Sequence, residues 1–141
     1  GRGIDQTVAL EGSLKLKEIS YIHSEAYPAG ELKHGTISLI EENTPVIGII
    51  TKDDIAIKTI SNLKETKARG SKIIIFTTKN IYKKYLKNKF YEEIIIINDI
   101  NSLLQSLITI TPIQLLSYYV ARERKEDIDK PRNLAKSVTV E

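Results

Sequence analysis

Three short apolar runs mark the middle of the chain: Val46 to Ile50, Lys72 to Phe76, and Ile94 to Ile97. Each run is rich in β-branched residues and is followed by polar or turn residues, a pattern typical of strands buried on both faces. Between the first two runs, apolar residues recur at helical spacing from Asp53 until Gly70, which suits a helix end. The order strand, helix, strand predicts a parallel pair.

The segments on either side of these runs predict further helices. We expect a short helix within Asn80 to Lys89, and a longer one that starts at Asn98 or Asp99 and runs to about residue 124. Pro112 lies inside this longer segment and is expected to break or kink it.

The first 21 residues have the pattern of a helix that follows a turn. Gln6 to Tyr21 carries a broad apolar stripe, and the sequence "GRG" precedes it. Because a helix after a glycine turn usually follows a strand, we expect a further strand directly before Gly1. The fold class predicted is α/β: a doubly wound sandwich of three to four parallel strands with helices on both faces.

Composition limits the kinds of site and partner that the chain can have. The 141 residues contain no Cys and only two His, which excludes disulfides and thiol nucleophiles and argues against a metal site. The net charge of +3 is too small to require nucleic acid. No apolar run is long enough to span a membrane and the first residues do not form a signal peptide, so we expect a cytoplasmic protein.

Two observations point to catalysis, each with a plainer explanation. Lys15 and Glu18 are three residues apart, so a helix places them on one face as a possible proton-transfer pair, although such pairs are also common on surfaces. His34 lies beside Gly35, where it could titrate near neutral pH or simply cap a short helix.

The final segment carries one lysine, Lys136, in a polar and aperiodic stretch. A lysine attacks a carbonyl only where burial or a nearby cation lowers its pKa. Lys136 therefore matters only if the tail folds back into a pocket; otherwise it belongs to a frayed chain end.

A run of lysines from Lys79 to Lys89 alternates with aromatic residues, as in some single-strand-binding surfaces. At helical spacing, however, Tyr82, Tyr85 and Leu86 form an inner face and the lysines a solvated outer face. We expect the second arrangement and no nucleic-acid partner.

The stretch "ALEGSLKLKEISYIHSEAYPAGELKHG" and the terminal "DKPRNLAKSVTVE" together resemble the C-terminal sugar isomerase (SIS) subdomain of glucosamine-6-phosphate synthases, the isomerising glutamine:fructose-6-phosphate aminotransferases. The resemblance is densest at the two ends of the chain. It implies that residues 1–129 form the second SIS subdomain and that residues 130–141 form a tail that folds over the active site.

The resemblance also implies a reaction and roles for individual residues. These enzymes make glucosamine 6-phosphate from fructose 6-phosphate and glutamine without a cofactor. Lys136 would form a Schiff base with C2 of the sugar, and Glu18 would bind the sugar and move a proton between C1 and C2. Lys15 would assist in handling charge, and the main chain at Ala135 would contact the sugar.

Further parts would have to come from elsewhere. The resemblance implies a homodimer in which His34 opens the sugar ring in the neighbouring active site. The chain has no phosphate-binding Ser/Thr loop and no N-terminal cysteine for glutamine hydrolysis. We therefore expect the glutaminase domain and the first SIS subdomain to be missing, and the chain alone to be inactive. The alternative is a non-catalytic module that senses sugar phosphates.

Overall fold

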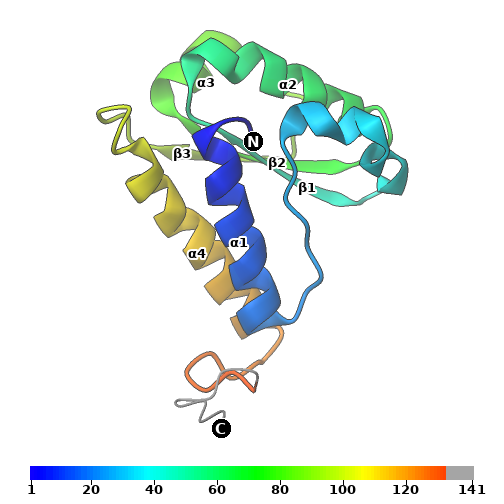
Figure 1. Cartoon of the computed structure of the whole chain (residues 1–141), viewed down its shortest axis with the longest axis vertical. Helices are drawn as coiled ribbons and strands as arrows, with labels where there is room; N and C mark the ends of the chain where they lie inside the picture. Colours follow the sequence, from blue (N-terminus) through cyan, green and yellow to red (C-terminus); the bar gives the residue numbers. More distant parts are fainter. Residues whose placement is uncertain (133–141) are drawn as a thin grey trace, which may run out of the picture.

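A sheet of three parallel strands forms the centre of the protein. The computed structural model describes residues 1–132 (Figure 1). The strands are β1 (Pro45–Ile50), β2 (Lys72–Thr78) and β3 (Glu93–Ile97). They lie in the order β1-β2-β3, and both pairs are parallel. All three strands predicted from the apolar runs are confirmed, as is their parallel direction. The expected burial on both faces is wrong for β3, a strand at the edge of the sheet, where Ile96 is 47% exposed.

Helices cover both faces of this sheet. On one face lie α2 (Asp53–Lys67) and α3 (Lys79–Tyr85), over a core that includes Ile50, Ile60, Leu63, Ile73, Ile75, Ile81 and Leu86. On the other face lie α1 (Ile4–Ser20) and α4 (Gln105–Glu123), which pack side by side over Val8, Ile49, Phe76, Ile97 and Ile113. The predicted α/β class with helices on both faces is confirmed.

The last helix departs from its predicted limits. It begins at Gln105 rather than at Asn98 or Asp99. The Gln105 side chain accepts a hydrogen bond from the Ile100 N–H and donates one to the Asn98 carbonyl, each at 3.1 Å, so it holds the preceding residues in turns. Pro112 does not break the helix, which continues through it to Glu123. The neighbouring Ile113 is buried against α1, and this packing offsets the hydrogen bond that proline cannot donate.

The chain leaves α1 through a residue with left-handed backbone, Tyr21, at φ 54°. Residues 22–28 then run without regular structure to two short 3₁₀ helices, η1 (Ala29–His34) and η2 (Thr36–Leu39). Because η1 packs on α2, this connection passes from the α1 face of the sheet to the α2 face around the side of β1 (Figure 1).

A buried carboxylate ties α1 to the sheet. Asp5 is 2% exposed and accepts hydrogen bonds from the backbone N–H of Thr51 at 2.8 Å and from its hydroxyl at 2.5 Å. Burial raises the pKa of Asp5, and the hydrogen bonds from Thr51 oppose that rise. The first turn of α1 is thereby held at the carboxyl end of β1.

Candidate active site

Lys15 and Glu18, the pair expected on α1, form an ion pair. The Lys15 Nζ lies 2.6 Å from the Glu18 Oε2 and 3.7 Å from the Glu11 Oε1. Both Lys15 and Glu18 are about one-third to one-quarter exposed, so a ligand from solvent can reach them. The hydrogen bond to Glu18 raises the pKa of Lys15, which stays a cation at neutral pH. A carboxylate held beside a permanent cation is a suitable group for proton transfer.

The last described residues of the chain return to this end of α1. The Arg132 guanidinium carbon lies 3.9 Å from the centre of the Tyr21 ring, and the Arg132 backbone N–H donates to the Tyr21 hydroxyl at 2.9 Å. Tyr21 follows Glu18 by three residues, which is less than one helical turn. Nothing local in the sequence signals this contact, because the two residues are 111 positions apart.

His34 lies in another part of the fold. It ends η1, is exposed, and precedes Gly35, whose φ of 140° a side chain rarely adopts. The neighbouring Lys33 pairs with Glu65 of α2 at 2.8 Å and lowers the pKa of that carboxyl. Figure 1 shows η1 beside α2, away from the C-terminal end of α1. One chain therefore brings Lys15 and Glu18 together but leaves His34 apart.

The remaining predicted site residues, Ala135 and Lys136, lie outside the described residues. The run from Lys79 to Lys89 lies within the described residues, and its side chains have the expected arrangement. Leu86 is fully buried, and Tyr82 and Tyr85 pack against the same core. Lys84 on the outer side pairs with Asp53 at 2.9 Å.

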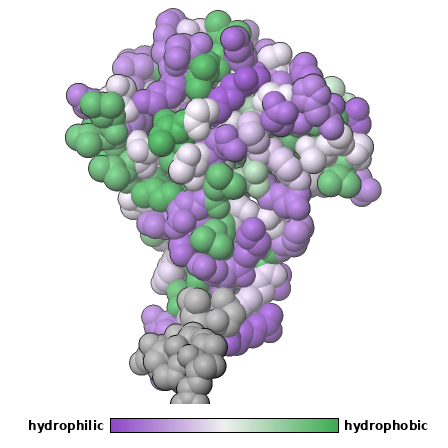
Figure 2. All heavy atoms as spheres, in the orientation of Figure 1, coloured by the Kyte–Doolittle hydropathy of each residue, from purple (hydrophilic) through white to green (hydrophobic). Residues whose placement is uncertain are grey.

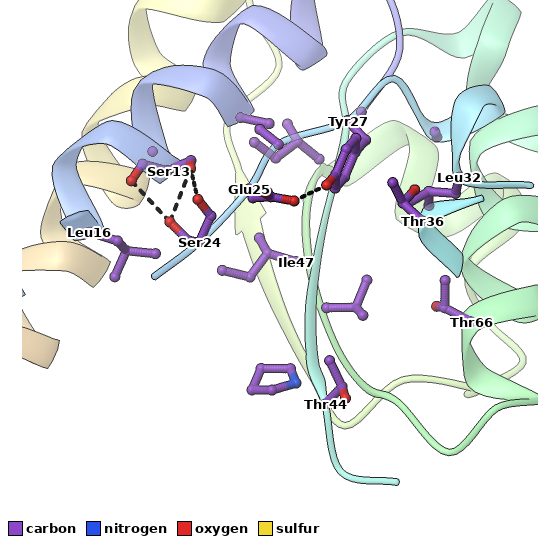
Figure 3. Close-up of a pocket in the computed structure, with 18 of the residues that line it drawn as sticks. Ser13, Leu16, Ser24, Glu25, Tyr27, Leu32, Thr36, Thr44, Ile47 and Thr66 are labelled. Atoms are coloured by element: carbon purple, nitrogen blue, oxygen red, sulfur yellow. Dashed lines mark hydrogen bonds between the residues drawn. The ribbon is translucent and has the colours of Figure 1, made fainter. Parts of the chain in front are cut away.

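A cleft of about 450 Å³ opens between the two helical layers beside β1. Its walls are mostly apolar, and none of Lys15, Glu18 and His34 lines it. In Figure 3, Ser13 of α1 is hydrogen-bonded to Ser24 on one side of the cleft, and Tyr27 donates to Glu25. No pattern in the sequence indicates this cleft, which is separate from the ion pair on α1.

The turn before α4 and the first turn of α4 form an exposed apolar patch. It consists of Ile100, Leu103, Leu104 and Leu107, which are 43%, 85%, 51% and 65% exposed. In Figure 2, hydrophobic side chains gather at the left of the molecule, where Figure 1 shows the turn before α4. A contiguous patch of this kind on a soluble protein usually marks a contact with another protein surface.

Two further features concern residues 1–132 alone. In this part of the chain, no helix is both long and apolar enough to cross a membrane. The same residues contain no group of three or more His, Asp or Glu side chains that could hold a metal ion.

Comparison with known proteins agrees with the resemblance expected from the sequence. The chain is 56% identical over its whole length to the glutamine–fructose-6-phosphate aminotransferase (isomerizing) of Caldanaerobacter subterraneus subsp. tengcongensis, and 57% identical to that of Clostridium tetani. It spans only 23% of the length of each relative.

Solved structures show the same fold. The C-terminal domain of glucosamine-fructose-6-phosphate aminotransferase from Francisella tularensis matches 92% of this chain, with a TM-score of 0.86 and 42% identity, over 36% of its own length. A putative phosphosugar isomerase from Silicibacter pomeroyi matches 92% of the chain with a TM-score of 0.75 and 25% identity, over 37% of its own length. The SIS domain family matches residues 1–124, and the chain belongs to this family.

Proposed function

We propose that this chain is the C-terminal isomerase portion of an isomerising glutamine:fructose-6-phosphate aminotransferase. Over its own whole length the chain is 56–57% identical to proteins of that name, which supports the assignment. The chain spans less than a quarter of those relatives, so the phosphate-binding loop and the source of ammonia would lie elsewhere in a longer protein. The substrate would be fructose 6-phosphate and the product glucosamine 6-phosphate.

The proposed chemistry uses a lysine and a carboxylate. The Lys136 amine adds to the C2 carbonyl of the open sugar, and water leaves to form an iminium. Ammonia derived from glutamine then replaces the lysine at C2. The C=N bond makes the hydrogen on C1 acidic, so the Glu18 carboxylate removes it and returns a proton to C2. The Lys15 ammonium donates a hydrogen bond to the Glu18 carboxylate and would hold it in position to accept that proton.

The observation that carries the proposal is the contact between Arg132 and Tyr21. It holds Arg132 against Tyr21, which follows Glu18 by three residues. Lys136 is four residues beyond Arg132, and four residues span at most about 14 Å. This short spacing supports the proposal that Lys136 reaches the Lys15–Glu18 pair, as the reaction requires.

His34 would serve the reaction from a second subunit. Its separation from Glu18 within one chain is consistent with a homodimer in which each His34 enters the neighbouring site and opens the sugar ring. The exposed apolar patch before α4 provides a surface for contact with a second subunit or with the missing SIS subdomain. The cytoplasm is the expected location.

The test is reduction by borohydride in the presence of fructose 6-phosphate, followed by peptide mass mapping. It is run on this chain and on the full-length product of the parent gene, with Lys136→Ala as the test variant and Lys130→Ala as the matched control in the same tail. We expect an adduct in the full-length product only, at the lysine that is Lys136 of this chain. The adduct should be lost in Lys136→Ala and kept in Lys130→Ala.

Two other results would change the assignment. Binding of the sugar by the full-length product with no adduct at Lys136 would favour a sugar-phosphate sensing module. Turnover of fructose 6-phosphate by the 141-residue chain alone would contradict the proposal that essential parts lie outside it.

A further inference from the structure

The turn that precedes α1 carries an arginine that reaches the helix layer on the other face of the sheet. The Arg2 Nη2 donates a hydrogen bond to the Asn62 Oδ1 at 2.9 Å. Asn62 belongs to α2 and is only 5% exposed, so the guanidinium meets a buried partner. The contact joins residues that are 60 positions apart, and it connects the start of α1 to α2.

The same guanidinium covers the backbone at the start of η1. A Cβ built on Gly30 would lie 2.8 Å from the Arg2 Nη2 and 3.1 Å from both its Cζ and its Nη1. These nearly equal distances indicate that the flat face of the guanidinium lies against Gly30, and a side chain there would displace it. One residue earlier, the Ala29 N–H donates to the Gly1 carbonyl at 2.8 Å. Gly1 and Arg2 therefore hold the first two residues of η1 (Figure 1).

The other end of η1 is tied to the same face of α2. Lys33 pairs with Glu65 at 2.8 Å, and Asn62 and Glu65 are three residues apart, so they share a helix face. Lys33 lowers the pKa of Glu65, and a hydrogen bond from the Asn62 amide lowers it further. The contacts thus run from Arg2 through Asn62 and Glu65 to Lys33, which directly precedes His34.

These contacts set the position of His34, because η1 has little stability of its own. It is a 3₁₀ helix of six residues without a side-chain cap, and such short helices depend on tertiary packing. The chain before it, residues 22–28, has no regular structure. After it, Gly35 is not packed: apart from its chain neighbours, no atom of residues 1–132 lies within 4 Å of the place where a Cβ would be.

We propose that Arg2 is a positioning residue for His34. Through Asn62 and Gly30 it holds η1 on α2, and this fixes where the exposed His34 imidazole is presented to a neighbouring subunit. The inference rests on the proposed function, in which His34 opens the sugar ring.

The consequence for the reaction is confined to one step. Ring opening breaks the bond between C2 and the ring oxygen O5: the C2 hydroxyl loses a proton as the carbonyl forms, and O5 gains one. Because the His34 imidazole carries this proton transfer, loss of the Arg2 contact should slow ring opening. The later steps at C1 and C2, which use Glu18 and Lys136, should be unchanged.

The experiment uses the full-length parent protein and compares Arg2→Met, His34→Gln and the double variant. Arg69→Met changes an exposed arginine just after α2 and is the matched control. With fructose 6-phosphate, we expect kcat to fall at least about tenfold in Arg2→Met and in His34→Gln, and to stay unchanged in Arg69→Met. Since Arg2 acts through His34, the double variant should be no slower than His34→Gln alone.

A second substrate separates ring opening from the later chemistry. The 5-deoxy analogue of fructose 6-phosphate lacks O5 and stays an open ketose. We expect Arg2→Met and His34→Gln to reduce turnover of this analogue by less than about twofold. The double variant needs only fructose 6-phosphate, so it decides the proposal where the enzyme does not accept the analogue.

Gly30→Ala provides an independent variant of the same contact. The added methyl group pushes the guanidinium away from η1 and leaves Arg2 in place. If Arg2→Met does not fold, Gly30→Ala is measured instead, with the same selective loss expected.

Three results would overturn this inference and leave the proposed function intact. They are unchanged turnover of fructose 6-phosphate in Arg2→Met, an equal loss on both substrates, and a loss in the double variant that multiplies the two single losses. An equal loss would give Arg2 a purely structural role, and multiplied losses would make it independent of His34. Unchanged turnover of fructose 6-phosphate in His34→Gln is a different outcome, because it would overturn the proposed role of His34 itself and this inference with it.

Discussion

The Arg132 guanidinium stacks on the Tyr21 ring, 3.9 Å from its centre, while the Arg132 backbone N–H donates to the hydroxyl of the same ring. One side chain thus holds both the main chain and the side chain of a residue 111 positions away. The left-handed backbone of Tyr21, at φ 54°, ends α1 and sets the position of the ring. The contact connects the start of the tail to the helix that carries Lys15 and Glu18.

The two parts of this contact can be separated by substitution. Tyr21→Phe keeps the aromatic face and removes the hydroxyl that accepts the hydrogen bond, whereas Tyr21→Ala removes both. We expect faster amide exchange at Arg132 in both variants, with the larger increase in Tyr21→Ala, because a cation–π contact contributes about 0.5–1 kcal/mol at such a site. Unchanged exchange in Tyr21→Ala would show that Tyr21 does not anchor the tail.

The Lys15–Glu18 ion pair should contribute little to the free energy of unfolding. Since both side chains are partly exposed, Lys15→Ala is expected to lower the free energy of unfolding by less than about 1 kcal/mol. Lys17→Ala, an exposed lysine on the same helix, is the matched control. In the full-length parent protein, Lys15→Ala should reduce turnover at least about tenfold while Lys17→Ala does not. Equal turnover in the two variants would remove Lys15 from the proposed site.

In the 141-residue chain prepared with a free α-amine at Gly1, burial lowers the pKa of that amine to about 6 from an ordinary value of 8.0. Between these two pH values the unfolded chain binds a proton at this amine and the folded chain does not. The free energy of unfolding should therefore rise from pH 6 to pH 8, by up to about 2 kcal/mol, and the gain is lost as pH falls through 6. Urea unfolding across this range would measure the rise.

Acetylation of the Gly1 amine provides the control for that experiment, because it removes the titrating group. The acetylated chain should lack this rise of stability with pH. The same rise in both forms would assign it to another group.

Close packing between α1 and α4 can be tested at Gly12. A Cβ added there would lie 2.4 Å from the Cγ2 of Ile113, which is only 3% exposed. Gly12→Ala should destabilise the chain by about 1–3 kcal/mol, despite the better helix propensity of alanine. Ile113→Leu, which lacks the β-branch, should recover part of that loss in the double variant. A stabilised Gly12→Ala chain would mean that the two helices can move apart at no cost.

The sequence determined much of the architecture because the relevant signals are local. The β-branched run Lys72 to Phe76 favours a strand covered on both faces, and the helical spacing between β1 and β2 favours a parallel pair. The spacing of Lys15 and Glu18 likewise predicted their contact, since residues three apart share a helix face. The start of α4 was not predictable in the same way, because the side-chain contacts of Gln105 with Asn98 and Ile100 depend on the folded turn.

Tertiary structure decided the relationships between distant segments. It alone placed Arg132 on Tyr21, kept His34 away from Glu18, and opened a cleft along β1, because each depends on how two helical layers pack around the sheet. A sequence pattern records the face that a residue occupies in its own helix or strand. It does not record which face of another element that residue meets, and this is set only when the apolar surfaces are buried together.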